Sequence, residues 1–176
     1  MRLPFFRSRV SRRDYTFGVR TGTAEPLAEP LAPTPPRQPR ELIDVIGVGA
    51  TETAGGVALT LLSLERYQEG LIAVFRLRRP RGRFEREFPS PRLVMTVKPA
   101  GTVPYQFLMS GGGGGGMREL EFRYAYTIVP APSTDAAEIV IRVSEISWER
   151  WNAGEPKVAS VDAGPWTFTV RLPPMA

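Results

Sequence analysis

Apolar residues recur at every second position in a series of short segments after Glu41. In the clearest segment, residues 119–128, Leu120, Phe122 and Tyr124 fall on one side while mostly charged residues occupy the other. This alternation is the period of a half-buried β-strand, and no segment has the period of an amphipathic helix. We expect strands over residues 42–48, 57–64, 71–78, 93–97, 105–109, 119–128, 138–146 and 166–172.

Turn signals separate these segments. Gln68-Glu69-Gly70 stands between two alternating runs and predicts a hairpin, and an extra apolar residue at Leu62 is typical of a β-bulge. About eight strands without intervening helices favour an antiparallel fold. We therefore predict an all-β domain over residues 41–176, an immunoglobulin-like Greek-key β-sandwich.

Two parts of the chain carry a family resemblance. Val57-x-Leu59-x-Leu61 followed by Gly70 to Leu77, and the closing stretch Gly164 to Val170, resemble the immunoglobulin-like β-sandwich domains of uncharacterised bacterial proteins. These include the ectodomains of anti-sigma-factor-like membrane proteins. The resemblance implies a binding or scaffolding sandwich without catalytic residues. The chain departs from those proteins in having no predicted transmembrane helix and no sigma-binding helical domain.

The net charge of +5 is unevenly distributed. Residues 1–20 contain six arginines and one acid, whereas the rest of the chain is balanced. Residues 24–40 hold six prolines, which disfavour both helix and sheet, so they predict an extended, polyproline-like linker. The expected organisation is a basic and aromatic tail over residues 1–23, the linker over residues 24–40, and the sandwich.

The tail has three interpretations. It could neutralise the phosphates of a nucleic acid, lie on an anionic membrane surface, or become ordered when it docks into a larger assembly. We favour docking, because aromatic side chains interspersed with arginines are typical anchors of protein interfaces. The predicted partner-binding residues are Phe5, Phe6, Arg7, Arg9, Arg12, Arg13, Tyr15 and Phe17.

A second basic cluster lies inside the predicted domain. Arginines with an interleaved phenylalanine suit single-stranded nucleic acid, where phosphates pair and bases stack, and they suit an acidic protein surface equally. The simplest alternative is an exposed, charged loop that closes a hairpin. The cluster consists of Arg76, Arg78, Arg79, Arg81, Arg83, Phe84 and Arg86.

The chain has no histidine and no cysteine. Histidine-based triads, thiolate nucleophiles and zinc ribbons are therefore excluded. Carboxylates remain, but Glu119 and Glu121 alternate on the polar face of a predicted strand, where acids are usually just solvated. We expect a protein that is not an enzyme, with no cofactor and no metal site.

Gly111 to Gly116 form an uninterrupted glycine run. No Lys-Ser/Thr pair follows, so a phosphate-binding loop is disfavoured. The run is typical of a flexible, glycine-rich hairpin loop, or of a strip of backbone packed closely against a partner. No apolar run follows Arg12-Arg13 as a signal peptide requires, and no segment is long and apolar enough to span a membrane, so we expect a cytoplasmic location.

These expectations describe a non-catalytic interaction or structural protein. Its N-terminal tail would anchor it among other protein subunits of a larger complex, while the sandwich forms a surface or scaffolding module. The alternative is a nucleic-acid-binding accessory protein that uses the tail and the Arg76–Arg92 loop. Peripheral contact with a membrane stays open.

Overall fold

The computed structural model describes residues 39–81, 89–99, 101, 103–116, 119–152 and 155–174. The predicted tail and nearly all of the predicted linker lie outside this part of the chain, as does the stretch from residue 82 to 88.

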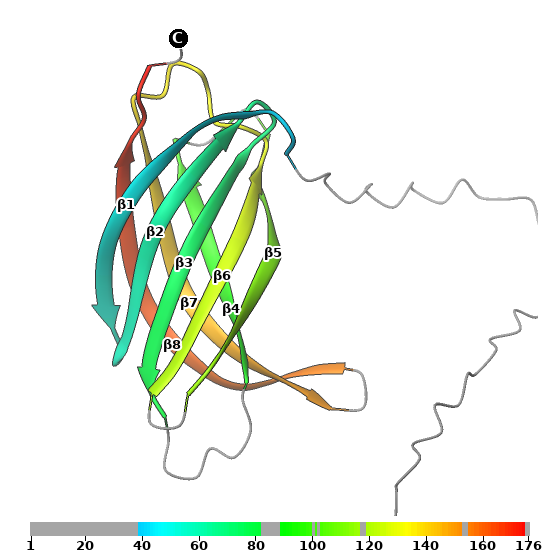
Figure 1. Ribbon diagram of the computed structural model, residues 1–176. Helices are drawn as coiled ribbons and strands as arrows, with labels where there is room; N and C mark the ends of the chain where they lie inside the picture. Colours follow the sequence, from blue (N-terminus) through cyan, green and yellow to red (C-terminus); the bar gives the residue numbers. More distant parts are fainter. Residues whose placement is uncertain are drawn as a thin grey trace, which may run out of the picture. The chain divides into compact units, whose positions relative to one another are not determined.

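Eight antiparallel strands form two sheets in the described residues. The five-stranded sheet, here sheet A, has the order β1-β2-β3-β6-β5, and the three-stranded sheet B has the order β4-β7-β8 (Figure 1). The strands are β1 (Leu42–Ala54), β2 (Val57–Tyr67), β3 (Leu71–Pro80), β4 (Ser90–Lys98), β5 (Gln106–Gly115), β6 (Glu119–Val129), β7 (Glu138–Asn152) and β8 (Glu155–Arg171).

The strand order is that of a constant-type immunoglobulin domain. In that fold the strands A, B, E and D make one sheet and C, F and G make the other. Here β2-β3-β6-β5 and β4-β7-β8 follow this order, and β1 is an additional strand outside β2. The prediction of an antiparallel immunoglobulin-like sandwich is confirmed, and the chain crosses between the sheets after β3, β4 and β6 as a Greek key requires.

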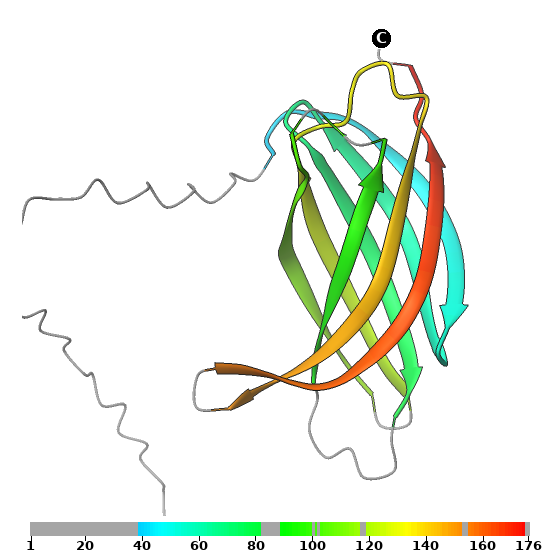
Figure 2. The same ribbon diagram turned by 180° about the vertical axis from the view of Figure 1, so that it is seen from behind.

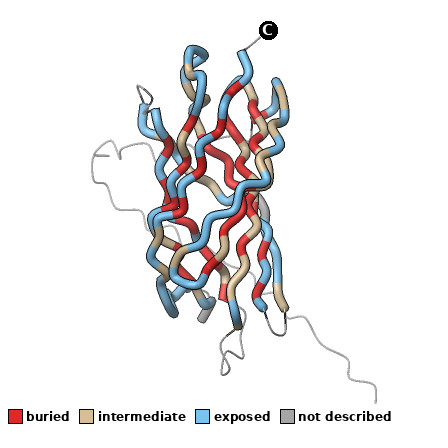
Figure 3. The backbone as a smooth tube through the Cα atoms, turned by 90° about the vertical axis from the view of Figure 1, so that its left-hand side faces the viewer, coloured by how far each residue is buried: buried red, intermediate tan, exposed pale blue. Residues whose placement is uncertain are grey.

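The core lies between the facing surfaces of the two sheets. Every second residue of β3, β4 and β6 is buried, and Figure 3 shows buried residues alternating with exposed ones along the strands. The two largest fully buried side chains are Trp148 and Trp166, both from sheet B. The alternation in the sequence therefore identified the inner face of β6 correctly.

Four strands extend well beyond the segments that the alternation predicts. β1 continues to Ala54, β5 continues through the glycine run, and β7 and β8 pair as far as Asn152 and Glu155. Beyond the last β4 pair, Ser90 with Glu149, the β7–β8 hairpin projects away from the sandwich as an arm (Figure 2). Residues 155–161 of this arm are all exposed, so no alternation marks them in the sequence.

The two sides of the sandwich differ. On the closed side, β1 and β8 lie next to each other, and Trp166 Nε1 donates a hydrogen bond of 3.1 Å to the carbonyl oxygen of Val57 in the opposite sheet. On the open side stand the unpaired edges of β4 and β5. One buried hydrogen bond crosses between the sheets towards this side, from the Leu93 amide to the Tyr126 hydroxyl at 3.0 Å.

Candidate functional site

A groove of about 620 Å³ runs along the open side. β4 and β5 form two of its walls, and the base of the β7–β8 arm forms the third. Core residues reach its surface there: Leu93 and Met95 come from β4, Phe107 from β5 and Tyr126 from β6. This groove, the open-side groove, exists because β4 and β5 have no neighbouring strand to cover the gap between the sheets.

Exposed apolar side chains gather at this groove. Val94, Met109, Val158 and Val161 all line it, and they are 45%, 55%, 54% and 50% exposed, respectively. Single exposed apolar residues are normal on protein surfaces, but a contiguous group beside a groove is typical of an interaction site. Removing this group from water would stabilise a complex by roughly 1–2 kcal/mol for each side chain that becomes fully buried.

Polar groups surround the apolar centre. Arg92 and Glu149 stand 3.7 Å apart at the rim, and the Arg92 side chain is 72% exposed. The Ser147 hydroxyl donates a hydrogen bond of 3.4 Å to the Arg92 carbonyl oxygen, which ties β7 to β4 beneath this ion pair. An apolar centre with a solvated, charged rim is the usual organisation of a protein–protein interface.

The glycine run forms part of β5 next to the groove. The prediction of a flexible loop is wrong for Gly111 to Gly115, which pair with β6 in regular register. Close packing against β6 explains two of these glycines. A Cβ at Gly112 would overlap the ring of Tyr124, and one at Gly114 would lie 2.1 Å from the Glu121 carbonyl oxygen and 2.6 Å from Phe122 Cδ1. Both rings lie across the glycine strand and take the volume that its side chains would otherwise fill.

The predicted basic cluster is distributed over several surfaces. Arg76 and Arg78 lie on the outer face of sheet A, opposite Arg123 and Glu121 of β6. Arg79 turns inward, with its guanidinium carbon 3.8 Å from the ring centroid of Trp148. Arg81 Nη1 donates a hydrogen bond of 3.0 Å to the Gly116 carbonyl oxygen.

The described arginines of this cluster therefore do not share one face. The remaining predicted members, Arg83, Phe84 and Arg86, lie outside the described residues, as do the tail residues Phe5, Phe6, Arg7, Arg9, Arg12, Arg13, Tyr15 and Phe17.

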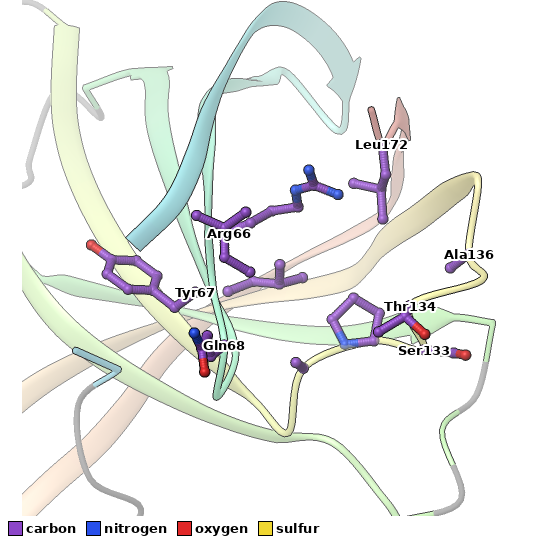
Figure 4. A pocket seen from close by; sticks show the side chains of 11 residues that line it. Arg66, Tyr67, Gln68, Ser133, Thr134, Ala136 and Leu172 are labelled. Carbon is purple, nitrogen blue, oxygen red and sulfur yellow. The ribbon is translucent and has the colours of Figure 1, made fainter. Parts of the chain in front are cut away.

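A second cavity, of about 480 Å³, opens at the end of the sandwich where β2 meets the segment after β6 (Figure 4). Arg66 reaches into it from β2 and is only 7% exposed. Its Nε and Nη2 atoms donate hydrogen bonds to the two carboxylate oxygens of Asp44. Its Nη1 atom donates a hydrogen bond of 2.9 Å to the Pro173 carbonyl oxygen. The guanidinium thus ties β1 and the end of the chain to β2, which is a structural role.

Sequence reasoning missed this clamp. Arg66 and Asp44 lie in separate segments, and only the pairing of β1 with β2 places them directly opposite each other.

Two tyrosines of β6 have raised pKa values. Burial, with a smaller contribution from neighbouring Tyr126, raises the pKa of Tyr124 to about 12. Burial also raises the pKa of Tyr126, although the Leu93 amide opposes the shift. Both phenols are therefore neutral at physiological pH, and the Tyr126 hydroxyl accepts the hydrogen bond from the Leu93 amide.

Glu119 and Glu121 are both exposed on the outer face of sheet A. Among the residues that the structure describes, no three acidic side chains come close enough to hold a metal ion. In the same residues, there is no helix of the length and apolar character needed to cross a membrane.

Neither a protein-family profile nor a curated protein matches the sequence. One solved structure is similar: a conserved domain protein from Bacillus anthracis, with a TM-score of 0.54 and 13% sequence identity. The alignment covers 74% of this chain and 49% of that chain, so the sandwich spans about half of the bacterial protein it matches. At this identity the match establishes the fold, an all-β arrangement shared with a bacterial protein.

Proposed function

We propose that this protein is a non-catalytic interaction module that binds a protein partner in the open-side groove. The supporting observation is the gathering of Val94, Met109, Val158 and Val161 around the groove. Four partly exposed apolar side chains on three different strands, β4, β5 and β8, offer a surface that a partner can cover. The charged rim would then contribute to specificity more than to affinity.

The experiment compares two valine substitutions in the full-length chain. Val161→Glu puts a charge into the groove, whereas Val45→Glu puts the same charge on β1, at the opposite edge of sheet A from β5. Val45 is 58% exposed and Val161 is 50% exposed, so both variants should fold normally. Partners recovered by affinity purification from the native source are identified by mass spectrometry and quantified for each variant.

We expect Val161→Glu to lose a partner that the wild type and Val45→Glu both retain. Equal recovery by all three proteins would contradict the assignment of the groove.

The N-terminal tail remains part of the proposal as a separate anchor in a larger complex. Deleting residues 1–40 tests it in the same purification, because a tail that anchors the protein would be needed for recovery of the complex. Unchanged recovery would show that the tail is not the anchor. The cytoplasmic location and the likeness to ectodomains of anti-sigma-factor-like proteins are likewise proposals, and the identity of the recovered partner tests both.

A further inference from the structure

Among the described strands, none pairs with the outer edge of β5. β5 pairs with β6 on one side and stands at the edge of sheet A on the other. Natural proteins usually protect such edges with charged side chains, prolines or interrupting bulges. From Gly111 to Gly115 the edge has no side chains, and its only bulge, between Met109 and Gly111, precedes the run. Its outward backbone groups are therefore accessible to another strand.

Packing against the residues that the structure describes does not explain Gly113. A Cβ at this position would have no heavy atom within 4 Å, and the backbone is not in the left-handed region. Glycine in a strand costs roughly 0.5–1 kcal/mol relative to alanine, so its presence usually marks a place where a ligand or another backbone approaches closely. Gly113 thus differs from Gly112 and Gly114, which are required by the aromatic rings beside them.

Positive charge stands next to this strip. Arg76 of β3 and Arg123 of β6 are directly opposite on the outer face of sheet A, and Arg123 is also opposite Gly113. Like charges in register destabilise a sheet. Within the described part of the chain, neither arginine takes part in an ion pair, and Arg76 Nε is buried without a hydrogen-bond partner. The exposed carboxylate of Glu121 stands on the same face opposite Gly115, but in the described residues it forms no ion pair with either guanidinium group.

We propose that an extended segment of an acidic partner adds a strand to the free edge of β5. This inference rests on the proposed function and names the mode of binding. Strand addition to a sheet edge supplies main-chain hydrogen bonds, and alternate side chains supply specificity. The partner segment would alternate acidic side chains, which face Arg123, with apolar side chains, which enter the open-side groove.

Strand geometry supports this pattern. Neighbouring strands lie about 4.8 Å apart, so an added strand would run roughly 10 Å from β6. An arginine and a glutamate can meet across that distance only if no side chain stands between them. The absence of a side chain at Gly113 leaves this path open for Arg123. On the inner side, Phe107 and Met109 of β5 border the groove that the apolar side chains would fill.

Two other arrangements are disfavoured. A second copy of this chain would bring two Arg76–Arg123 pairs onto one sheet, and glycine paired with glycine offers no side chains to fix the register. The edge of β4 is less available, because the Leu93 amide already donates to Tyr126. The partner is therefore a different protein, and its strand joins β5.

The test uses the purified full chain and labelled peptides of about ten residues, the length of β5. One peptide alternates glutamate and valine, a second alternates lysine and valine, and a third has the composition of the first but with the alternation broken. Fluorescence anisotropy measures affinity, and NMR measures hydrogen exchange of the amides of Gly111 to Gly115. Arg123→Glu reverses the charge beside the strip, and Arg142→Glu makes the same change at an exposed site on sheet B.

We expect the glutamate–valine peptide to bind more tightly than the other two and to protect the glycine amides. Arg123→Glu should weaken this binding at least tenfold and improve binding of the lysine–valine peptide, while Arg142→Glu should behave as the wild type. Equal binding of the peptide with broken alternation, or unprotected glycine amides, would overturn the inference. Glycine amides that are protected without peptide, in a protein that sediments as a dimer, would instead assign the edge to a second copy.

The two proposals fail separately. If Val161→Glu loses its partner but the glutamate–valine peptide leaves the glycine amides unprotected, the groove binds the partner without strand addition.

Discussion

The ring of Tyr124 lies across Gly112, its cross-strand neighbour in β5. At Gly114 both the β6 backbone and the ring of Phe122 come close, and the two rings stack with centroids 6.0 Å apart. An aromatic side chain that covers a glycine on the next strand compensates for the missing side chain there. The part of β5 from Gly111 to Gly115 is thus packed against β6 on its inner face, although it has no side chains of its own.

Substitutions at neighbouring glycines should have opposite effects. Gly112→Ala forces the Tyr124 ring out of place and should destabilise the domain by roughly 1–3 kcal/mol, as overpacking of a core does. Gly113→Ala meets open space and should stabilise it by roughly 0.5–1 kcal/mol, because alanine loses less chain entropy on folding. Urea unfolding measures both. Equal shifts of the two midpoints would show that the ring does not constrain the strand.

Removing the Tyr126 hydroxyl should weaken the contact between the sheets. In Tyr126→Phe the buried Leu93 amide loses its acceptor, and an unsatisfied buried donor costs roughly 1–3 kcal/mol. The control is Tyr124→Phe, which removes a hydroxyl for which no hydrogen bond is found in the described residues. The free energy of unfolding at neutral pH should fall for the first variant and change little for the second. A similar loss in both would contradict the bridging role.

The domain should lose stability in alkaline solution. Tyr124 has a pKa of about 12 in the folded protein and an ordinary value of 10.0 when unfolded. The folded state therefore holds this proton more tightly, so the stability it provides is complete below pH 10 and is lost as the pH rises towards 12. Unfolding free energies measured across this window should decline, and less steeply in Tyr124→Phe. An identical slope in the variant would rule out Tyr124 as the cause.

The ion pair between Arg66 and Asp44 should contribute more to the free energy of unfolding than a surface ion pair does. Asp44→Asn leaves an arginine that is only 7% exposed without its charged partner, and breaking such a buried pair typically costs roughly 3–5 kcal/mol. Because Asp44 is partly exposed, we expect the lower end of that range. Glu149→Gln breaks the longer ion pair with Arg92, whose side chain is 72% exposed, and should cost less than about 1 kcal/mol. Thermal or urea unfolding of both variants tests the difference, and equal costs would contradict it.

Alternation in the sequence predicted the architecture because one face of each strand is buried. Residues 119–128 alternate visibly since β6 lies in the middle of sheet A with a core on one side. The strand formed by Gly111 to Gly115 was not predicted, because a glycine run has no alternation. The aromatic rings that pack against this strand belong to β6. The arm formed by β7 and β8 was not predicted for a different reason. Residues 155–161 are all exposed, so they show no alternation, and they form a strand by pairing with β7.

The candidate site was not predictable in the same way. Val94, Val158 and Met109 are unremarkable residues in separate segments, and only the strand order brings them to one groove. The arginines from Arg76 to Arg81, by contrast, form an obvious cluster in the sequence. The alternating directions of side chains along β3 send Arg79 to the interior and leave Arg76 and Arg78 outside, so the cluster is divided by the fold.

The additional strand β1 has a consequence for self-assembly. A sheet with two available ends can add copies at both, and such head-to-tail growth continues without limit. In this domain β1 lies against β8, and the two remaining edges, β4 and β5, border the same groove. Whatever joins β5 therefore also obstructs β4. These two edges therefore accept one added strand between them, so strand addition on the open side cannot continue from β5 to β4.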